Sequence, residues 1–405
     1  PLSWGIIAEH KQGSYMFDFC INGAGMVGAA TALGLAQQGY QVAIIEQRPP
    51  QPFDAAQPPD LRMSAISVAS VDLLRALGAW QYIEAMRVRS YSELSVWEQP
   101  DCRTDFNASD AGFERLGYFV ENRLIQLGCH QALQDFDNVK WYSPAHIAGI
   151  KRSASADEPV IIRLESGDEL TAKWLIGADG AESQVRQLAG IGISGWQYAQ
   201  QAMGIIVEFT QPVADCTWQQ FTPHGPRALL PMHDNYASLI WYDSPARLAA
   251  LTKLSPAQLK QAIENDFPPL GDDFTVLNKA AFTLIRRHAS EYVVPGVILV
   301  GDAAHTINPL AGQGVNLGFK DVACLLTQTA NGQANGVDFP ARLRTGYQRP
   351  RQRDNALMMS AMDGFYTTFS NDHTPLKWLR NGLLKLAQHT GPIKAQVLKY
   401  AMGLA

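Results

Sequence analysis

Three glycines near the start of the chain have the spacing of a dinucleotide-binding loop. The motif is Gly-Ala-Gly-Met-Val-Gly, with cofactor-facing residues Gly23, Gly25, Met26, Val27 and Gly28. In such a loop the first glycine permits a tight turn, the second lets the backbone approach a pyrophosphate, and the third lets a helix pack on a strand. The helix start then offers free N–H groups to phosphates. Glu46, 18 residues after Gly28, can accept hydrogen bonds from ribose hydroxyls.

The elements that would position this loop are visible in the hydrophobic pattern. Phe17 to Ile21 is a short apolar run typical of a buried strand, and residues 26–38 repeat small and apolar side chains at helical spacing. Gly39 ends that helix, and Val42 to Ile45 form a second strand that leads into Glu46. The sequence therefore predicts a strand–loop–helix–strand unit that binds either NAD or FAD.

Two later segments carry similar features. Residues 174–186 predict a strand that ends at Asp179-Gly180, followed by a short helix containing Arg186. Residues 297–318 predict a buried strand, the pair Gly301-Asp302, a glycine-rich loop and a helix from about Gly314 to Thr329. Either Asp-containing pair alone is typical of an ordinary turn. Three such segments in this order indicate one composite cofactor site.

In order and spacing these segments resemble the FAD-dependent aromatic hydroxylases of the para-hydroxybenzoate hydroxylase type. The resemblance implies an α/β fold, in which a Rossmann-like FAD-binding domain is interleaved with a β-sheet substrate domain and followed by C-terminal helices. It implies bound FAD, with NAD(P)H as a transient reductant, because only one glycine-rich dinucleotide motif is present. A helix N-terminus near the flavin would stabilise the negative charge of the reduced ring.

The same resemblance assigns roles to individual residues. Asp302, next to Gly301, would contact the ribityl chain, while Asp179 and Arg186 would serve nucleotide binding and fold integrity. Pro309 would line the catalytic pocket at the flavin face. The flavin-facing backbone would be that of Gly312, Gly314, Val315 and Asn316.

Other segments narrow the resemblance to the hydroxylases of ubiquinone biosynthesis. They are residues 60–67, 117–123, 190–198, 217–231 and 241–247. This family resemblance implies hydroxylation of the ring of a polyprenylated benzoquinol, through reduction of FAD by NAD(P)H and a flavin C4a-hydroperoxide formed with O2. Arg62 and Arg123 would lie on the FAD side, where a guanidinium can clamp a phosphate or the flavin edge; the alternative is that they are ordinary surface arginines. No residue stands out as a general base, and His224 and His288 are interpreted as structural.

Four functional alternatives follow from these residues. A sibling enzyme of the same pathway would act at another ring position, and a related hydroxylase would act on a small soluble phenol. Flavin-dependent halogenation would need a WxWxIP pattern, which is absent. A non-catalytic FAD-bound scaffold subunit is disfavoured by the intact flavin-facing loop.

The family layout predicts interleaved domains. FAD-binding segments would cover residues 16–90, 116–190 and 282–348, and substrate-domain segments 91–115 and 191–281. Residues 349–405 would form a C-terminal helical region. Residues 1–15 are interpreted as a leader or expression-derived segment, with Met16 as the natural start.

Composition excludes several classes of protein. The 405 residues carry a net charge of −5, which gives no general attraction to nucleic acid. Five widely spaced cysteines without a CxxC pair favour free thiols in a reducing cytoplasm over a disulfide framework or a metal site. No run approaches the roughly 18 apolar residues of a membrane span, and no secretory signal precedes Met16.

The charge is unevenly distributed. Residues 374–405 contain five basic and no acidic residues. At helical spacing one apolar face would hold Leu376, Leu379, Leu383 and Leu386, and another Ile393, Val397, Ala401 and Leu404. A basic amphipathic helix can lie on an anionic membrane surface. The alternative is that it packs on its own domain. The polyprenyl tail of the implied substrate favours peripheral contact with the inner membrane or with a ubiquinone-biosynthesis protein complex.

Overall fold

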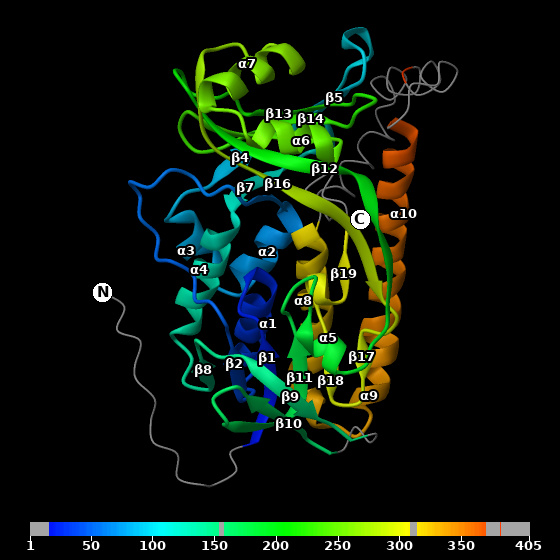
Figure 1. Cartoon of the computed structure of the whole chain (residues 1–405). Helices are drawn as coiled ribbons and strands as arrows, with labels where there is room; N and C mark the ends of the chain where they lie inside the picture. The colour runs from blue at the N-terminus through cyan, green and yellow to red at the C-terminus, as the bar shows by residue number, and fades with distance from the viewer. Residues whose placement is uncertain (1–15, 154–157, 308–313, 370–380, 382–405) are drawn as a thin grey trace.

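The computed structural model describes residues 16–153, 158–307, 314–369 and 381. Two large sheets lie at opposite ends of the molecule, and one long helix runs beside both of them (Figure 1).

The first sheet has a parallel core of five strands. Its main order is β17 (Val293–Val294), β18 (Val297–Leu299), β11 (Glu169–Gly177), β1 (Met16–Asn22), β2 (Val42–Ile45) and β8 (Val139–Tyr142). The parallel core is β18, β11, β1, β2 and β8, and β17 pairs antiparallel with β18. The antiparallel strands β10 (Val160–Leu164) and β9 (Ile147–Lys151) extend it from β11. Because β1 is parallel to both β2 and β11, and β11 to β18, the carboxyl ends of these four strands meet at one edge.

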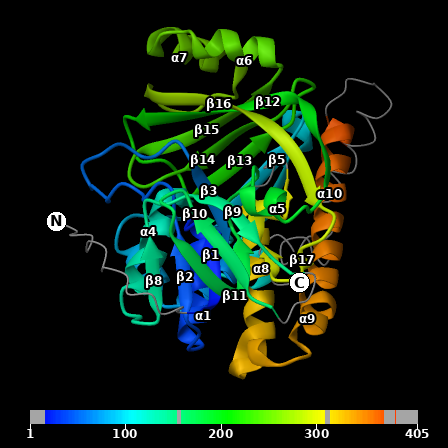
Figure 2. The ribbon, with the colours of Figure 1, turned by 60° about the horizontal axis from the view of Figure 1, so that its bottom comes forward.

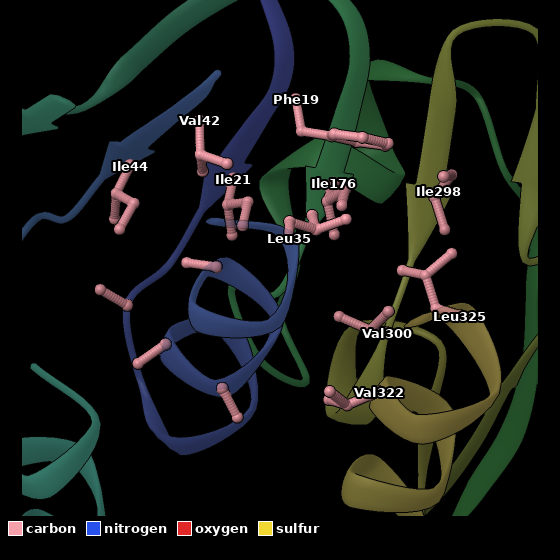
Figure 3. Packing of buried hydrophobic residues seen from close by; sticks show 14 of the residues in the cluster. Phe19, Ile21, Leu35, Val42, Ile44, Ile176, Ile298, Val300, Val322 and Leu325 are labelled. Atoms are coloured by element: carbon pink, nitrogen blue, oxygen red, sulfur yellow. The ribbon is translucent and has the colours of Figure 1, made fainter. Parts of the chain in front are cut away.

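Helices cover the apolar strands of this sheet. Leu35 of α1 (Met26–Gln37) lies beside Ile21 and Ile176, while Val322 and Leu325 of α8 (Gly314–Thr329) approach the β18 segment (Figure 3). Helix α4 (Asn122–Leu133) packs against α1, and the short α5 (Gln184–Leu188) contacts β11. Burial of this large apolar cluster is the main stabilising contribution to this end of the molecule.

The second sheet is mixed and contains two long strands, β12 (Ile193–Phe209) and β16 (Phe274–Ala289). Its order is β19-β16-β12-β15-β14-β13-β5-β6. The remaining strands are β5 (Glu93–Trp97), β6 (Thr104–Asn107), β13 (Cys216–Gln220), β14 (Arg227–Pro231), β15 (Tyr236–Asp243) and β19 (His305–Thr306). Helices α6 (Pro245–Thr252) and α7 (Pro256–Asp266) cover one face (Figure 2). That face is apolar at alternate positions, including Met203, Ile205 and Val207.

Smaller elements connect the two sheets. Strands β3 (Met63–Ser67), β7 (Gly117–Glu121) and β4 (Arg89–Tyr91) form a third sheet beside α2 (Val68–Ala76) and α3 (Trp80–Glu84). The last elements are α9 (Phe339–Arg342) and α10 (Arg349–Phe369). Short helical turns are η1 (Pro100–Cys102), η2 (Ala108–Ala111), η3 (Gly301–Ala303), η4 (Ala330–Asn335) and η5 (Leu343–Gln348).

The expected α/β fold class and its main elements are confirmed. The predicted first strand, first helix and second strand correspond to β1, α1 and β2, and the predicted helix over residues 314–329 is α8. Strands β5 and β6 join the second sheet. The expected boundary between residues 281 and 282 falls inside β16, which continues unbroken to Ala289.

No helix in the described ranges is long and apolar enough to cross a membrane. The five cysteines are free thiols, three of them buried. Residues 1–15 lie outside the described residues, and so does the basic segment 374–405 apart from Asn381.

Candidate cofactor site

The three sequence motifs meet at one edge of the first sheet. The glycine loop follows β1, Glu46 follows β2, the Asp179 segment follows β11, and the Gly301-Asp302 pair follows β18 and Val300. Ligands of doubly wound α/β sheets bind at the carboxyl ends of the strands. The sheet topology therefore brings the three motifs, which are far apart in the sequence, to one place.

The motif glycines differ in the space around them. A Cβ atom on Gly23 would lie 2.6 Å from the carbonyl oxygen of Ala178, and Gly23 has a φ of +96°. A Cβ atom on Gly28 would lie 1.9 Å from the carbonyl oxygen of Gly23. No atom lies within 4 Å of the position of a Cβ on Gly25. Gly23 and Gly28 are thus required for packing, whereas Gly25 faces open space at the start of α1, where a pyrophosphate would approach.

Glu46 is tied to the glycine loop. Its Oε2 accepts a hydrogen bond from the backbone N–H of Ala24 at 2.6 Å, and its Oε1 accepts one from the N–H of Arg48 at 2.7 Å. A carboxylate has about four acceptor positions, so capacity for ribose hydroxyls remains. The carboxylate is half-buried beside the loop, as the proposed ribose contact requires.

Two residues of α4 that the motifs did not reveal also anchor the loop. Gln126 donates from Nε2 to the carbonyl oxygen of Ala24 at 2.8 Å, and His130 Nε2 lies 2.7 Å from the same oxygen. Burial lowers the pKa of His130, and this outweighs the opposing effects of the Ala24 carbonyl and Glu46. A neutral imidazole that donates from Nε2 satisfies this geometry. The loop is therefore held in its shape by the protein itself.

Asp179 and Arg186 act within the protein. Asp179 accepts hydrogen bonds from Asn22 Nδ2 at 2.9 Å and from the N–H of Gln184 at 2.8 Å, so it joins β1 to the start of α5. Arg186 is buried and donates to the carbonyl oxygens of Ala303 and Ala181, each at 2.9 Å. These contacts correspond to the fold-integrity role that was expected for the pair.

Gly301 brings the first and third motifs into contact. Val27 of α1 lies 3.2 Å from the position that a Cβ on Gly301 would take, and 2.6 Å from the corresponding position on Gly318. Gly301 has a φ of +58°, which favours glycine. A larger residue at either glycine would push α1 away from the turn that carries Asp302.

The carboxylate of Asp302 has no hydrogen-bond partner among the described residues, and it is exposed. Protein atoms nevertheless crowd it enough that desolvation raises the pKa of Asp302, against the opposing effects of His305 and Arg62. A polar group that is exposed, desolvated and unpartnered can receive a hydroxylated ligand. The ribityl contact that the family resemblance implies for Asp302 stays a prediction.

The start of α8 faces the same region, but one of its predicted residues has a structural task. The Asn316 side chain accepts from the N–H of Ser67 at 3.0 Å and donates to the carbonyl oxygen of Ala65 at 2.8 Å. Its side chain thus joins α8 to β3, and only its backbone could face a flavin. Gly314 and Val315 are half-buried in the first turn. Pro309 and Gly312 lie outside the described residues.

The two arginines that were predicted to lie on the FAD side differ in their side-chain contacts. Arg123 is engaged by Asp60 at 2.7 Å and donates to the carbonyl oxygens of Gln51 and Pro52 at 3.0 and 2.8 Å. Its guanidinium therefore fixes the loop before β3, and most of its N–H groups are used within the protein. Arg62 lies on the loop so fixed, is exposed, and contributes positive potential at Asp302.

The sequence motifs also did not reveal a buried polar cluster that lies beneath the turn from Gly301 to His305, which carries Asp302. Asp321 of α8 contacts His305 at 2.5 Å, the N–H of Gly301 at 2.9 Å and Arg351 of α10 at 2.7 Å. A charged residue between Leu317 and Leu325 on the apolar face of α8 was a usable signal, because a buried charge needs a partner.

The donor set fits FAD. Gly25 leaves room for a pyrophosphate, Glu46 and Asp302 supply acceptors for hydroxyl groups, and α8 points its N-terminus at their edge of the sheet. Among the described residues no group of three or more His, Cys, Asp or Glu could hold a metal ion. These residues suit an organic dinucleotide cofactor.

Comparison with known proteins agrees with this geometry. Residues 16–354 match the model of the FAD binding domain family. The chain is 48% identical over 390 residues to 3-demethoxyubiquinol 3-hydroxylase of Escherichia coli (strain K12), covering 96% of this chain and 98% of that protein. It is 32% identical to the rat ubiquinone biosynthesis monooxygenase COQ6, mitochondrial (95% and 91% covered), and 32% identical to ubiquinone hydroxylase UbiL of Rhodospirillum rubrum (95% and 89% covered).

Solved structures share the fold at lower identity. p-Nitrophenol 4-monooxygenase PnpA from Pseudomonas putida DLL-E4 superposes with a TM-score of 0.78 at 17% identity, covering 97% of this chain and 99% of that chain. Aklavinone-11 hydroxylase, solved with FAD and aklavinone, gives a TM-score of 0.69 at 18% identity, with 90% and 70% covered.

The fold and the site thus define a flavoprotein monooxygenase that uses FAD with NAD(P)H as reductant. Within that class, the chain belongs to the family of ubiquinone-biosynthesis hydroxylases.

Proposed function

We propose that this protein hydroxylates the ring of a polyprenylated benzoquinol, at the position used by 3-demethoxyubiquinol 3-hydroxylase. The same activity is called 2-polyprenyl-3-methyl-6-methoxy-1,4-benzoquinol hydroxylation. The 48% identity over almost the whole of both chains supports this ring position over that of a sibling enzyme. The co-substrates are O2 and NAD(P)H.

One observation carries the enzymatic part of the proposal. The unpartnered carboxylate of Asp302, the open space at Gly25 and the start of α8 all lie at the same edge of the first sheet. A bound FAD supplies the redox and oxygen-transfer chemistry. The residues of the chain hold that group, orient it and limit the access of water.

The second sheet offers a surface for the quinol ring on the face that α6 and α7 do not cover. There Tyr198, Ala202, Tyr242 and Leu284 form a buried apolar cluster, and Tyr366 of α10 packs against it. An apolar wall excludes water from the reacting ring and accommodates a prenyl chain. Burial raises the pKa of Tyr242 far above its usual value, so its phenol stays protonated. We propose that this face lines the substrate site. The family resemblance adds Pro309 to that lining, a residue outside the described part of the chain.

A substrate panel tests the ring position. FAD-loaded protein would be given NADH or NADPH, O2 and one of three polyprenyl rings, each lacking the oxygen substituent at a different position. Consumption of demethoxyubiquinol alone, with the new hydroxyl located by mass spectrometry, is the expected result. Turnover of a different ring would assign the protein to a sibling step. Turnover of small phenols but not of prenylated rings would overturn the substrate class.

The basic segment 374–405 supports a peripheral membrane contact at the inner membrane. Lys377, Arg380, Lys385, Lys394 and Lys399 give it a charge of +5. We expect the protein to sediment with anionic vesicles and not with neutral ones, because basic amphipathic helices bind anionic lipid. The matched variant replaces these five residues by glutamine. Undiminished binding of that variant would exclude the segment as the membrane contact.

A further inference from the structure

A buried carboxylate near the cofactor site, that of Asp321, takes no part in the proposed cofactor contacts. Asp321 is fully buried in the middle of α8. Its Oδ2 accepts from the N–H of Gly301 at 2.9 Å and lies 2.5 Å from His305 Nε2, while its Oδ1 accepts from Arg351 Nε at 2.7 Å.

The two residues that contact Oδ2 of Asp321 lie on either side of Asp302 in the sequence, and Asp302 is the residue proposed to contact the ribityl chain. Gly301 immediately precedes Asp302, and His305 follows it by three positions in β19. The N–H of Ala304 closes the turn on the carbonyl oxygen of Gly301 at 2.9 Å. One carboxylate oxygen thus holds both ends of the short segment that presents Asp302. Asp302 itself makes no side-chain hydrogen bond to the described residues that could fix its direction.

Arg351 connects this arrangement to the C-terminal helix. It donates from Nη2 to Asn355 Oδ1 at 2.8 Å, and Asn355 donates in turn to the hydroxyl of Tyr292 at 3.1 Å. Burial alone would raise the pKa of Asp321, but His305 and Arg351 outweigh it, so the pKa of Asp321 is lowered. A buried ion pair contributes little net stability compared with an apolar replacement. The role of this pair is therefore argued from the segment that it positions.

We propose that Asp321 is a positioning residue for the cofactor, because it fixes the Gly301–His305 turn and thereby aims Asp302 at the bound FAD. Arg351 keeps the carboxylate of Asp321 paired, so α10 forms part of the support of the cofactor site. The inference rests on the proposed contact between Asp302 and FAD. It assigns no role in the chemical step to Asp321.

A purely structural role is the competing explanation, and Tyr347 provides the matched control. Tyr347 is also fully buried, and its hydroxyl donates to the carbonyl oxygen of Leu299 at 2.6 Å, two residues before Gly301. Tyr347→Phe removes one buried hydrogen bond from the same strand without touching the Asp302 turn. Asp321→Asn keeps the size of the side chain but loses its charge.

The test measures flavin release from the holoenzyme, by the rise of flavin fluorescence on dilution, together with thermal unfolding at saturating FAD. Both variants should lower the melting temperature. Only Asp321→Asn should weaken FAD binding, by roughly tenfold or more, as expected for a lost or misaligned hydrogen bond to a charged group. It should also alter the visible absorption of the bound flavin. Equal weakening in both variants, or unchanged release and spectrum in Asp321→Asn, would overturn the proposal.

Two further comparisons between variants protect the test against a folding failure. His305→Gln retains an N–H donor toward Asp321 and should keep most of the FAD affinity that His305→Ala loses. In the double variant Asp302→Asn/Asp321→Asn, FAD affinity should fall little below that of Asp302→Asn alone, because both changes act through one contact. Fully additive losses would contradict the inference. Failure of the wild-type protein to bind FAD would instead refute the proposed function.

Discussion

A Cβ atom on Gly28 would lie 1.9 Å from the carbonyl oxygen of Gly23. This contact distinguishes Gly28 from Gly25, the second glycine of the motif. Gly28 is needed for the first turn of α1 to pack against the loop that precedes it, whereas Gly25 has open space in the direction of its missing side chain.

Alanine at these two positions should therefore have different effects. Gly28→Ala inserts a methyl group against backbone, which costs roughly 1–3 kcal/mol or more in unfolding free energy. Gly25→Ala should change stability by less than about 1 kcal/mol, yet weaken FAD binding at least tenfold because its methyl group occupies the approach of the pyrophosphate. Circular dichroism and flavin titration separate the effects. Tight FAD binding by Gly25→Ala would place the pyrophosphate elsewhere.

Asp302→Asn should improve stability while it impairs binding. Because the pKa of Asp302 is raised in the folded protein, the folded chain retains a proton over a pH range in which the unfolded chain has lost it. The free energy of unfolding thus falls as pH rises through the ordinary value of 3.8 toward the folded value, and it stays lower above that value. Asp302→Asn has no carboxyl group to ionise at this position, so its free energy of unfolding does not fall for this reason as the pH rises.

The measurement is urea unfolding of protein freed of FAD, at pH 7 and near pH 3. We expect Asp302→Asn to be more stable than the wild type at pH 7 and to lose that advantage in acid. Its flavin affinity should fall, since the charged acceptor is gone. A variant that is less stable at pH 7 and binds FAD normally would contradict the role of Asp302.

Asp321 predicts the opposite pH dependence. Its pKa is lowered in the folded protein, so its stabilising contribution is present above the unfolded value and is lost as pH falls toward the folded value. Unfolding of the FAD-saturated wild type should therefore become easier below pH about 4 more steeply than unfolding of Asp321→Asn. Parallel pH curves for the two proteins would show that Asp321 is not selectively ionised in the fold.

The two arginines near β3 can be separated by substitution. Arg123→Ala leaves Asp60 without its ion-pair partner and frees the loop at Gln51 and Pro52, so it should lower stability by about 1–3 kcal/mol. Arg62→Ala should leave stability within about 0.5 kcal/mol, because the residue is exposed, and should weaken FAD binding. Thermal unfolding and flavin titration on both variants check this. An Arg62→Ala variant with normal FAD affinity would identify it as an ordinary surface arginine.

The sequence was sufficient for features that depend on local order. The spacing of Gly23, Gly25 and Gly28 between an apolar strand and a small-residue helix predicted the cofactor loop, and the helix expected to end at Thr329 is α8. Local sequence patterns depend on the backbone conformation of neighbouring residues, and that conformation is the same in the folded protein.

The sequence was insufficient where function depends on pairs that only the fold brings together. Arg351 is 30 positions from Asp321, and His130 is 106 positions from Ala24, so no spacing rule links them. Arg123 was expected at the cofactor because its type suits phosphate. In the structure Arg123 pairs with Asp60 and donates to the carbonyl oxygens of Gln51 and Pro52. Side-chain partners of this kind follow from tertiary contacts alone.

The origin of the transferred oxygen tests the central claim most directly. FAD-loaded protein would be incubated with demethoxyubiquinol, NAD(P)H and ¹⁸O2, and the product mass measured. The account predicts one ¹⁸O atom in the ring hydroxyl and NAD(P)H oxidation that depends on the quinol. Unlabelled product, or NAD(P)H oxidation without any oxygen entering the ring, would contradict it.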